Sequence, residues 1–217
     1  GGGDVGGALT EDKRIDGVIF TGSTDVAKKI NQLLSEREDN PVLIAETGGM
    51  NAMIVDSTAL PEQVCTDVLS SAFDSAGQRC SALRILCLQD DIAEPTLEMI
   101  KGAMDELVVG RPDQLSCDVG PVIDEEAQNN LLEHINHLKQ HTSYHSVSPK
   151  DVDANRSTFV NPILFELNDL SELKKEVFGP VLHVVKYRAN QLDELIDAIN
   201  SKGYALTHGI HLSLIHI

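Results

Sequence analysis

Short apolar runs alternate along the chain with segments in which apolar residues recur every three or four positions. A short apolar run predicts a strand, and the three-to-four spacing predicts an amphipathic helix. Because strands joined through helices run parallel, the alternation predicts an α/β fold with a largely parallel sheet. The expected strands cover residues 15–21, 41–46, 51–56, 83–89 and 159–165, with strand-like segments in 174–187 and 205–212. The expected helices cover residues 23–37, 60–77, 92–107, 124–141 and 191–200.

Three segments carry further expectations about burial and loops. The strands over 15–21 and 41–46 are nearly continuous apolar runs, so we expect both strands to be buried. The opening GGGDVG matches the pattern G-x-G-x-x-G, but no strand precedes it, so we expect a glycine-rich loop there. Residues 142–157 are polar, and we expect a loop over that segment.

Charge, hydropathy and cysteine content exclude several classes of partner and compartment. The chain has 17 basic and 34 acidic residues, and its net charge of −17 argues against sequence-independent binding of nucleic acid or anionic lipid. No stretch reaches the ~18 consecutive apolar residues of a membrane span, and no charged and then apolar segment opens the chain, so we expect neither a span nor a signal peptide. The four cysteines contain no C-x-x-C pair, which predicts a reduced, cytoplasmic setting.

The segment FTGST, at residues 20–24, joins an expected strand to an expected helix through a glycine. Backbone N–H groups and the positive end of the helix dipole at such a junction form a site for a pyrophosphate group. Junctions of this kind are common, however, and the pattern alone is a weak indication of a phosphate site.

Two further stretches contain residue types that perform nucleophilic catalysis. In GQRCSALR, at residues 77–84, Cys80 lies beside Arg79, whose positive charge favours a reactive thiolate. In AETGGMN, at residues 45–51, Glu46 ends an apolar strand, where an unpaired carboxylate is costly unless it has a function. Taken alone, Cys80 is also consistent with a small buried residue of the core, which is the usual state of a cysteine.

The remaining cysteines and a group of histidines have a structural interpretation. Cys65 and Cys87 fall within a helical and a strand pattern and are expected in the core, and Cys117 is expected in a loop. Four histidines occur at helix-like spacing without an obvious carboxylate or thiol to complete a ligand set, so we expect no metal site. The histidines are His134, His137, His141 and His145, of which we expect the first three on a solvated helix face.

The motifs FTGST, AETGG, GQRCSALR and EVFGPV occur in this order, and together they resemble the NAD(P)-dependent aldehyde dehydrogenase superfamily. The resemblance covers nearly the whole chain, to about His211. Residues 45–89 and 172–187 are most similar to the L-glutamate γ-semialdehyde (1-pyrroline-5-carboxylate) dehydrogenase region of bacterial bifunctional proline utilisation A proteins. The resemblance implies an aldehyde dehydrogenase fold, with part of a Rossmann-like NAD-binding domain followed by most of an α/β catalytic domain.

The resemblance also implies a role for each matching residue. Cys80 matches the catalytic nucleophile, whose backbone N–H helps to hold the developing oxyanion. Glu46 matches the general base that activates water to hydrolyse a thioester. The residues that match contacts to the NAD pyrophosphate, to the nicotinamide ribose and to the nicotinamide ring are Gly22, Ser23, Glu176 and Phe178.

The activity implied by the resemblance is NAD-dependent oxidation of a small-molecule aldehyde, L-glutamate γ-semialdehyde, to L-glutamate, the second step of proline catabolism. The resemblance further implies a homo-oligomer for the full-length protein, and FAD only in a proline dehydrogenase domain upstream. Two alternatives stay open. The chain is also consistent with a dehydrogenase of the same superfamily for another semialdehyde, or with an inactive thiol-bearing fragment.

Comparison with the family pattern leads us to expect a fragment. Residues 1–46 correspond to the C-terminal part of the NAD-binding domain, and residues 47–217 to a catalytic domain truncated at its C-terminus. Residues 212–217 depart from the family pattern. We therefore expect this chain by itself to be inactive and poorly soluble.

Overall fold

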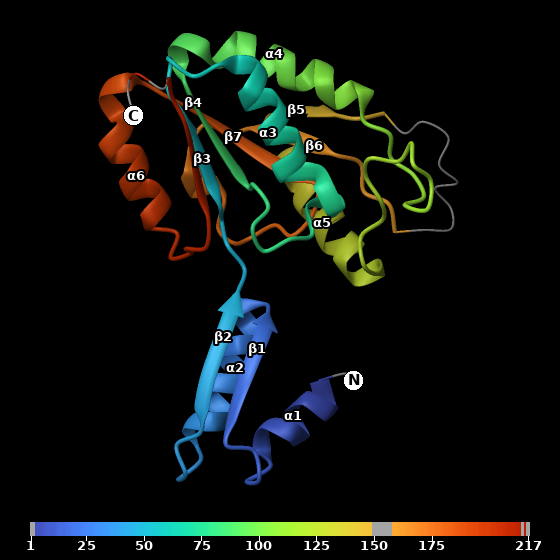
Figure 1. Cartoon of the computed structure of the whole chain (residues 1–217), viewed down its shortest axis with the longest axis vertical. Coiled ribbons are helices and arrows are strands. Elements are labelled where there is room, and N and C mark those ends of the chain that lie inside the picture. The colour runs from blue at the N-terminus through green and yellow to red at the C-terminus, as the bar shows by residue number, and fades with distance from the viewer. Residues whose placement is uncertain (1–2, 149–157, 214, 216–217) are drawn as a thin grey trace. The chain divides into compact units, whose positions relative to one another are not determined.

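The computed structural model describes residues 3–148, 158–213 and 215, and the chain divides into two compact units (Figure 1). Unit 1 covers Gly1–Gly48 and unit 2 covers Gly49–Ile217. Each unit is built around its own sheet of mainly parallel strands. The assignment of residues 1–46 to a cofactor domain and of 47–217 to a catalytic domain stays a prediction.

Unit 1 is built around a parallel pair of strands. Its elements are α1 (Gly3–Glu11), β1 (Gly17–Gly22), α2 (Thr24–Ser35) and β2 (Val42–Thr47). The strands and α2 lie where the sequence predicts them, but α1 occupies the expected glycine-rich loop, so that prediction is wrong. The glycines lower the helix propensity of α1, but the helix packs against α2, and this tertiary contact overrides propensity.

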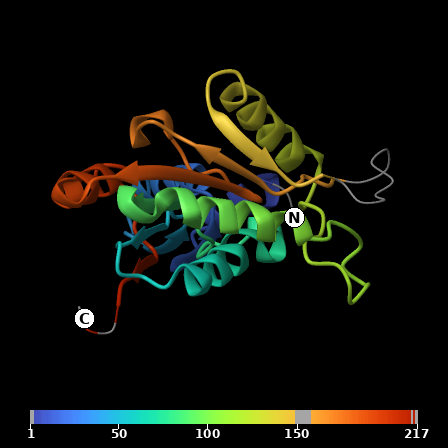
Figure 2. The same cartoon turned by 90° about the horizontal axis from the view of Figure 1, so that it is seen from above.

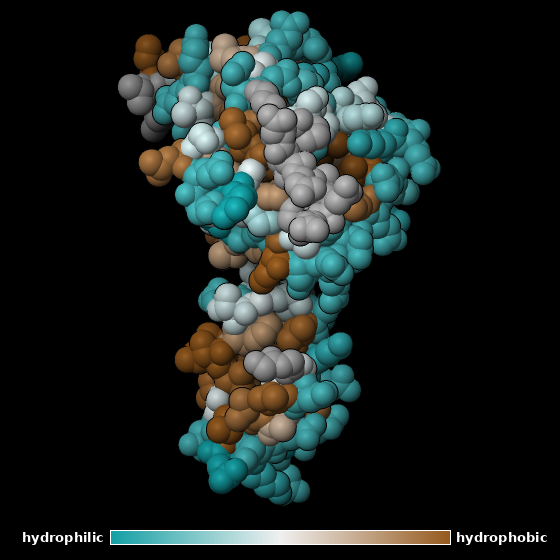
Figure 3. Space-filling view, turned by 90° about the vertical axis from the view of Figure 1, so that its right-hand side faces the viewer, coloured by the Kyte–Doolittle hydropathy of each residue, from teal (hydrophilic) through white to brown (hydrophobic). Residues whose placement is uncertain are grey.

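The strands of unit 1 are buried on one face only, which corrects the expectation that both are buried. Val18, Phe20 and Leu43 are partly buried, whereas Ile19 is 81% exposed and Ile44 is 49% exposed. Successive side chains of a strand point to opposite faces, and Ile19 and Ile44 are in register. The two isoleucines therefore lie on one uncovered face, and Figure 3 shows apolar side chains at the surface of this unit.

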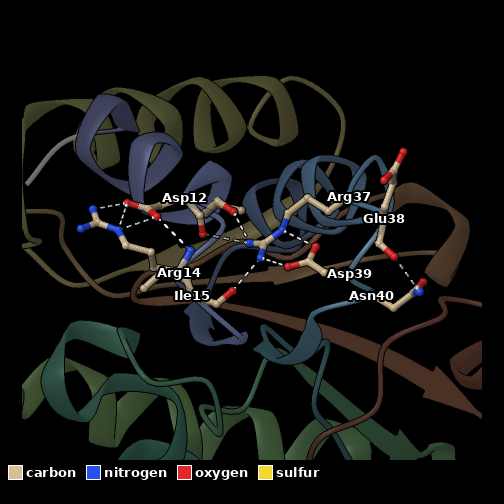
Figure 4. Close-up of polar contacts among 8 residues, drawn as sticks. Asp12, Arg14, Ile15, Arg37, Glu38, Asp39 and Asn40 are labelled. Atoms are coloured by element: carbon tan, nitrogen blue, oxygen red, sulfur yellow. Dashed lines mark hydrogen bonds and ion pairs between the residues drawn. The ribbon is translucent and has the colours of Figure 1, made fainter.

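A largely buried guanidinium fixes the connection between α1 and β1. Arg37 follows α2, and its Nη1–H groups donate to the carbonyl oxygens of Thr10 at 3.1 Å and Asp12 at 3.2 Å (Figure 4). Its Nη2–H donates to the carbonyl oxygen of Ile15 at 2.8 Å. Asp39 forms an ion pair with the same guanidinium. One side chain thus satisfies three loop carbonyls and holds the start of β1 against the end of α2.

Unit 2 contains, among its described residues, a six-stranded sheet in the order β5-β6-β7-β4-β3-β8. The strands are β3 (Ala52–Val55), β4 (Ile85–Gln89), β5 (Ser143–Ser146), β6 (Ile163–Glu166), β7 (Val181–Tyr187) and β8 (His208–His211). All neighbouring pairs are parallel except β5 and β6, which confirms the expected largely parallel sheet. β5 falls within the expected polar loop over 142–157, which is wrong for those four residues; residues 149–157 lie outside the described residues.

Helices cover both faces of this sheet. They are α3 (Pro61–Phe73), α4 (Asp90–Glu106), α5 (Glu125–Leu138) and α6 (Leu192–Asn200), with short 3-10 turns η1 (Asp74–Gly77), η2 (Leu170–Glu172) and η3 (Ala189–Gln191). Figure 2 shows α3 and α4 on one face and α5 on the other. Every residue of the central strand β4 is buried, as expected for a parallel strand covered on both sides. Within the described residues, no helix combines the length and apolar character needed to cross a membrane.

Loops that precede four neighbouring strands meet at one edge of the sheet in unit 2. β7, β4, β3 and β8 are adjacent and parallel, so residues just before them lie along the same, amino-terminal edge. Asn51 precedes β3, Cys80 lies in the loop before β4, and Thr207 precedes β8. Glu176 and Phe178 lie in the turn before β7. The topology therefore brings residues from distant parts of the sequence to one edge.

Candidate active site

Cys80 lies in the connection between α3 and β4, where the backbone adopts an unusual conformation. Ser75, Ala76 and Gly77 have φ angles of 56°, 54° and 63°, all in the left-handed region. Such residues are strained unless they are glycine, so tertiary contacts must hold the segment in place. A Cβ atom at Gly77 would lie 2.2 Å from the carbonyl oxygen of Gly179. Only glycine therefore fits at this position, where the loop before β4 packs against the turn before β7.

Cys80 differs from the other thiols of the chain in its exposure. It is exposed, whereas Cys65 and Cys87 are buried as the sequence predicts, and burial raises the pKa of Cys87 to about 12. Cys117 is partly buried, and its Sγ lies 3.5 Å from the carbonyl oxygen of Val119. The interpretation of Cys80 as a buried core residue is therefore wrong. Within the described residues, the backbone N–H of Cys80 donates no hydrogen bond, so it is available to an oxyanion.

A buried amide holds the Cys80 loop from the side of β3. Asn51 is 4% exposed, and its Nδ2–H groups donate to the carbonyl oxygens of Cys80 at 2.7 Å and Ala82 at 2.8 Å. Its Oδ1 accepts the backbone N–H of Thr207 at 3.1 Å. Sequence reasoning did not single out Asn51, although it closes the AETGGMN motif. Its position directly before an apolar strand, where an amide must be satisfied by loop backbone, was the available signal.

The turn before β7 places Glu176 and Phe178 close to a buried cation. Glu176 Oε1 lies 3.5 Å from Nη2 of Arg84 and, within the described residues, accepts no hydrogen bond. Burial raises the pKa of Glu176, and the charge of Arg84 opposes this effect. Phe178 is 45% exposed, and the centroid of its ring lies 5.1 Å from the Arg84 guanidinium carbon. Sequence reasoning also left out Arg84. The signal for a special role was the charge of this residue directly before an otherwise apolar strand.

The remaining site candidates lie at the carboxyl edge of the sheet in unit 1. Gly22 ends β1 and pairs with Thr47, so Glu46, the preceding residue of β2, lies beside it at the same edge. Ser23 is the N-cap of α2, and its Oγ accepts the backbone N–H of Val26 at 3.3 Å. Glu46 is exposed. The carboxyl edge of parallel strands is where open α/β sheets bind ligands.

One histidine departs from the expected solvated face of α5. His134 is partly buried, and its Nε2 lies 2.9 Å from Nε2 of His183, a fully buried residue of β7. His137 and His141 are exposed, as expected. Within the described residues, no group of three or more histidine, cysteine, aspartate or glutamate side chains is placed to hold a metal ion.

Comparison with known proteins identifies relatives of this arrangement. The model of the aldehyde dehydrogenase family matches residues 1–213. The bifunctional protein PutA of Klebsiella aerogenes is 56% identical over 216 residues, covering 95% of this chain and 16% of that protein. The chain thus spans about a sixth of the length of this relative.

Solved structures show the same similarity. A crystal structure of bifunctional proline utilization A (PutA) superposes with a TM-score of 0.93 at 49% identity, covering 98% of this chain and 21% of the other. A 1-pyrroline-5-carboxylate dehydrogenase from Thermus with bound NAD superposes with a TM-score of 0.88 at 31% identity. That match covers 100% of this chain and 42% of the other.

Proposed function

The chain belongs to the aldehyde dehydrogenase family and has part of its fold, and we propose that it is a segment of an NAD-dependent enzyme that oxidises L-glutamate γ-semialdehyde to L-glutamate. This reaction is the second step of proline catabolism. The observation that carries the proposal is Cys80, an exposed thiol in a tightly held loop with an available backbone N–H. The names of the similar proteins support the choice of substrate, because they include 1-pyrroline-5-carboxylate dehydrogenase.

In the proposed reaction, the Cys80 thiolate attacks the aldehyde carbon and forms a carbon–sulfur bond. The carbonyl oxygen takes up the negative charge, and the Cys80 N–H donates to it; one such donor contributes about 2.7–4 kcal/mol in comparable sites. When bound, NAD would supply the acceptor for the hydride that this carbon loses, and Cys80 would then carry a thioester. Glu46 is the proposed general base that takes a proton from water. The water oxygen then attacks the thioester carbon, the carbon–sulfur bond breaks, and L-glutamate leaves.

The residues expected to hold NAD suit such a cofactor. Glu176 Oε1 is buried and, beyond its 3.5 Å ion pair with Arg84, accepts no hydrogen bond among the described residues, whereas the ribose hydroxyls are donors. The exposed ring of Phe178 offers an apolar surface for the nicotinamide ring. Gly22 and Ser23 lie at the amino end of α2, a helix of 12 residues, where a pyrophosphate is stabilised by N–H groups and the dipole. We assign the binding of NAD to these four residues.

The same proposal extends to the setting of the full-length enzyme. It acts in the cytoplasm, where its four free thiols stay reduced. It forms a homo-oligomer, and FAD serves only a proline dehydrogenase domain upstream of this segment. The word "bifunctional" in the name of the Klebsiella aerogenes relative supports a second activity in the longer protein.

The test uses the full-length protein with glutamate γ-semialdehyde and NAD, and follows NADH by absorbance. Cys80→Ala should abolish turnover but leave NAD binding nearly unchanged, because the thiol forms the covalent intermediate and does not hold the cofactor. Cys117→Ala is the matched control and should keep wild-type turnover. Appreciable turnover by Cys80→Ala contradicts the mechanism, and a faster reaction with a shorter semialdehyde than with glutamate γ-semialdehyde contradicts the choice of substrate.

A second measurement separates the role of Glu46 from that of Cys80. In Glu46→Gln the thioester should persist because water is no longer deprotonated, so intact-protein mass spectrometry should show an acyl adduct on Cys80. The wild-type enzyme should show little of this adduct at steady state. A Glu46→Gln variant that turns over at the wild-type rate without an adduct excludes Glu46 as the base.

A further inference from the structure

Arg84 directly precedes β4 at the amino edge of the sheet in unit 2. Its guanidinium contacts the backbone of two segments at this edge, the Cys80 loop and the turn before β7. The residue is 1% exposed. Its Nη1–H groups donate to the carbonyl oxygens of Gly77 at 2.7 Å and Gly179 at 3.2 Å, and its Nη2–H donates to that of Arg79 at 3.0 Å. Gly77 and Arg79 belong to the Cys80 loop, whereas Gly179 belongs to the turn before β7. One side chain therefore joins its own loop to a turn in which Gly179 lies 95 residues further along the chain than Arg84.

The same guanidinium also contacts the side chains of that turn. Glu176 forms an ion pair with it at 3.5 Å, and the ring of Phe178 lies against it. In the proposed function, these two residues of unit 2 bind the nicotinamide ribose and the nicotinamide ring. Arg84 thus lies between the proposed nucleophile's loop and the proposed cofactor-binding turn.

We propose that Arg84 is a positioning residue that sets the spacing between the Cys80 loop and the Glu176–Phe178 turn. The inference rests on the proposed function, in which Cys80 is the nucleophile and the turn binds the nicotinamide. The distance between loop and turn then sets the distance between the nucleophile and the nicotinamide. Arg84 takes no part in bond making and touches no reacting atom. It acts through the carbonyls of Gly77 and Arg79, which precede Cys80, and through the orientation of the Glu176 carboxylate.

The chemistry of the guanidinium explains why arginine occupies this position. Its rigid, planar fork presents several N–H donors at fixed angles, so that two nitrogens can serve carbonyls of two different segments at once. A lysine ammonium is a compact charge on a flexible stem and cannot hold three carbonyls and a carboxylate in one plane. Burial lowers the pKa of Arg84, and Glu176 opposes this effect, yet an arginine remains charged.

Asn51 supports the same inference from the other side of the loop. It bonds the carbonyl oxygens of Cys80 and Ala82, whereas Arg84 bonds those of Gly77 and Arg79. The loop is therefore held on both sides of Cys80. Only the arginine, of these two side chains, also reaches the turn before β7.

The first test measures the connection itself by hydrogen exchange of the full-length protein. Arg84→Lys keeps the charge but loses the fork, so amide exchange in residues 74–83 and in residues 176–180 should both become about tenfold faster. Arg188→Lys is the matched control, because Arg188 is exposed and lies beyond the opposite end of β7. Exchange that rises in one of the two segments only, or in neither, overturns the inference.

The second test measures the consequence for catalysis in the same variants. Misplacement of a nucleophile by about 1 Å costs on the order of 10²-fold in rate, so kcat of Arg84→Lys should fall by about that factor and KM for NAD should rise. A merely structural role would lower the melting temperature but leave kcat and KM of the folded molecules at wild-type values, and that result overturns the inference. Arg84→Met should show a larger loss; if it does not fold, Arg84→Lys decides the question alone.

The two tests separate failure of this inference from failure of the proposed function. If wild-type protein does not oxidise the aldehyde but both segments loosen together in Arg84→Lys, the proposed function is wrong and the connection through Arg84 stands. If wild-type protein is active and Arg84→Lys has wild-type kcat and KM, the proposed function stands and the positioning role is wrong.

Discussion

Mild acid should destabilise unit 2, because the unit contains a buried neutral histidine, His183, bonded to a partly buried one, His134. His183 Nδ1 lies 3.0 Å from the carbonyl oxygen of Arg84, and its Nε2 lies 2.9 Å from Nε2 of His134. A carbonyl oxygen only accepts, so His183 Nδ1–H donates to it, and His134 Nε2–H donates to His183. Burial lowers the pKa of His183 to about 3 and that of His134 to about 4.

The sign and size of the effect follow from proton linkage. Both histidines have a pKa near ~6.5 in the unfolded chain. The unfolded chain therefore binds more protons than the native one below that pH, and the free energy of unfolding falls as the pH falls. Between pH 7.5 and pH 5, His183 should remove about 2 kcal/mol of stability. His134 is partly exposed, and solvent screening reduces its share to about 1 kcal/mol.

The assay is urea unfolding followed by circular dichroism at pH 7.5 and pH 5. The wild-type chain should lose about 3 kcal/mol, a large part of the ~5–15 kcal/mol of a typical domain. The double variant His134→Gln/His183→Gln should lose much less, and His134→Gln alone should lose an intermediate amount. His137→Gln, an exposed position of the same helix, is the matched control and should behave as wild type. Equal losses in wild type and both variants would refute the argument.

Four further substitutions have outcomes that the structure predicts. Gly77→Ala should prevent native folding, because the new Cβ would overlap the carbonyl group of Gly179 in the facing turn. Gly102 lies within α4 with open space around it, so Gly102→Ala should raise the free energy of unfolding by about 0.5–1 kcal/mol, measured by thermal unfolding. Arg37→Met should speed amide exchange in residues 10–16, because three carbonyls lose their donor. The affinity of the wild-type protein for NAD should fall in mild acid, because Glu176 has a raised pKa and takes up a proton there. Glu176→Gln should bind NAD more weakly and without this pH dependence. The same dependence of NAD affinity on pH in wild type and variant would contradict the role of Glu176.

The regular elements could be predicted because their cause is local. The strands of the central sheet are apolar runs, and the helices between them repeat apolar positions at helical spacing, so each element is visible in its own residues. β5 was missed because it is an edge strand of polar residues with a single neighbour, and its pairing with β6 supplies what its sequence lacks. The sequence also fails to predict α1, because its glycines disfavour a helix and only its packing against α2 favours one.

The candidate site could be predicted only in part, for a related reason. Cys80 and Glu46 carry chemistry in their own side chains, so their residue type draws attention to them. The roles of Asn51 and Arg84 come from backbone carbonyls that the fold brings to them, in one case from 95 residues away. No spacing in the sequence encodes such a contact. The left-handed conformation of Ser75 and Ala76 was equally hidden, because neither residue type favours it.

The charge of Arg84 and the path of the Cys80 loop depend on each other. Burying a guanidinium costs several kcal/mol, and Arg84 Nε finds no acceptor among the described residues, so the position is not optimised for stability alone. An apolar side chain would fill the space but leave the carbonyls of Gly77, Arg79 and Gly179 without their donor, at about 1–3 kcal/mol each. If an apolar residue replaced Arg84, the loop would have to take a different path to satisfy these carbonyls. Cys80 would then lie in a different position.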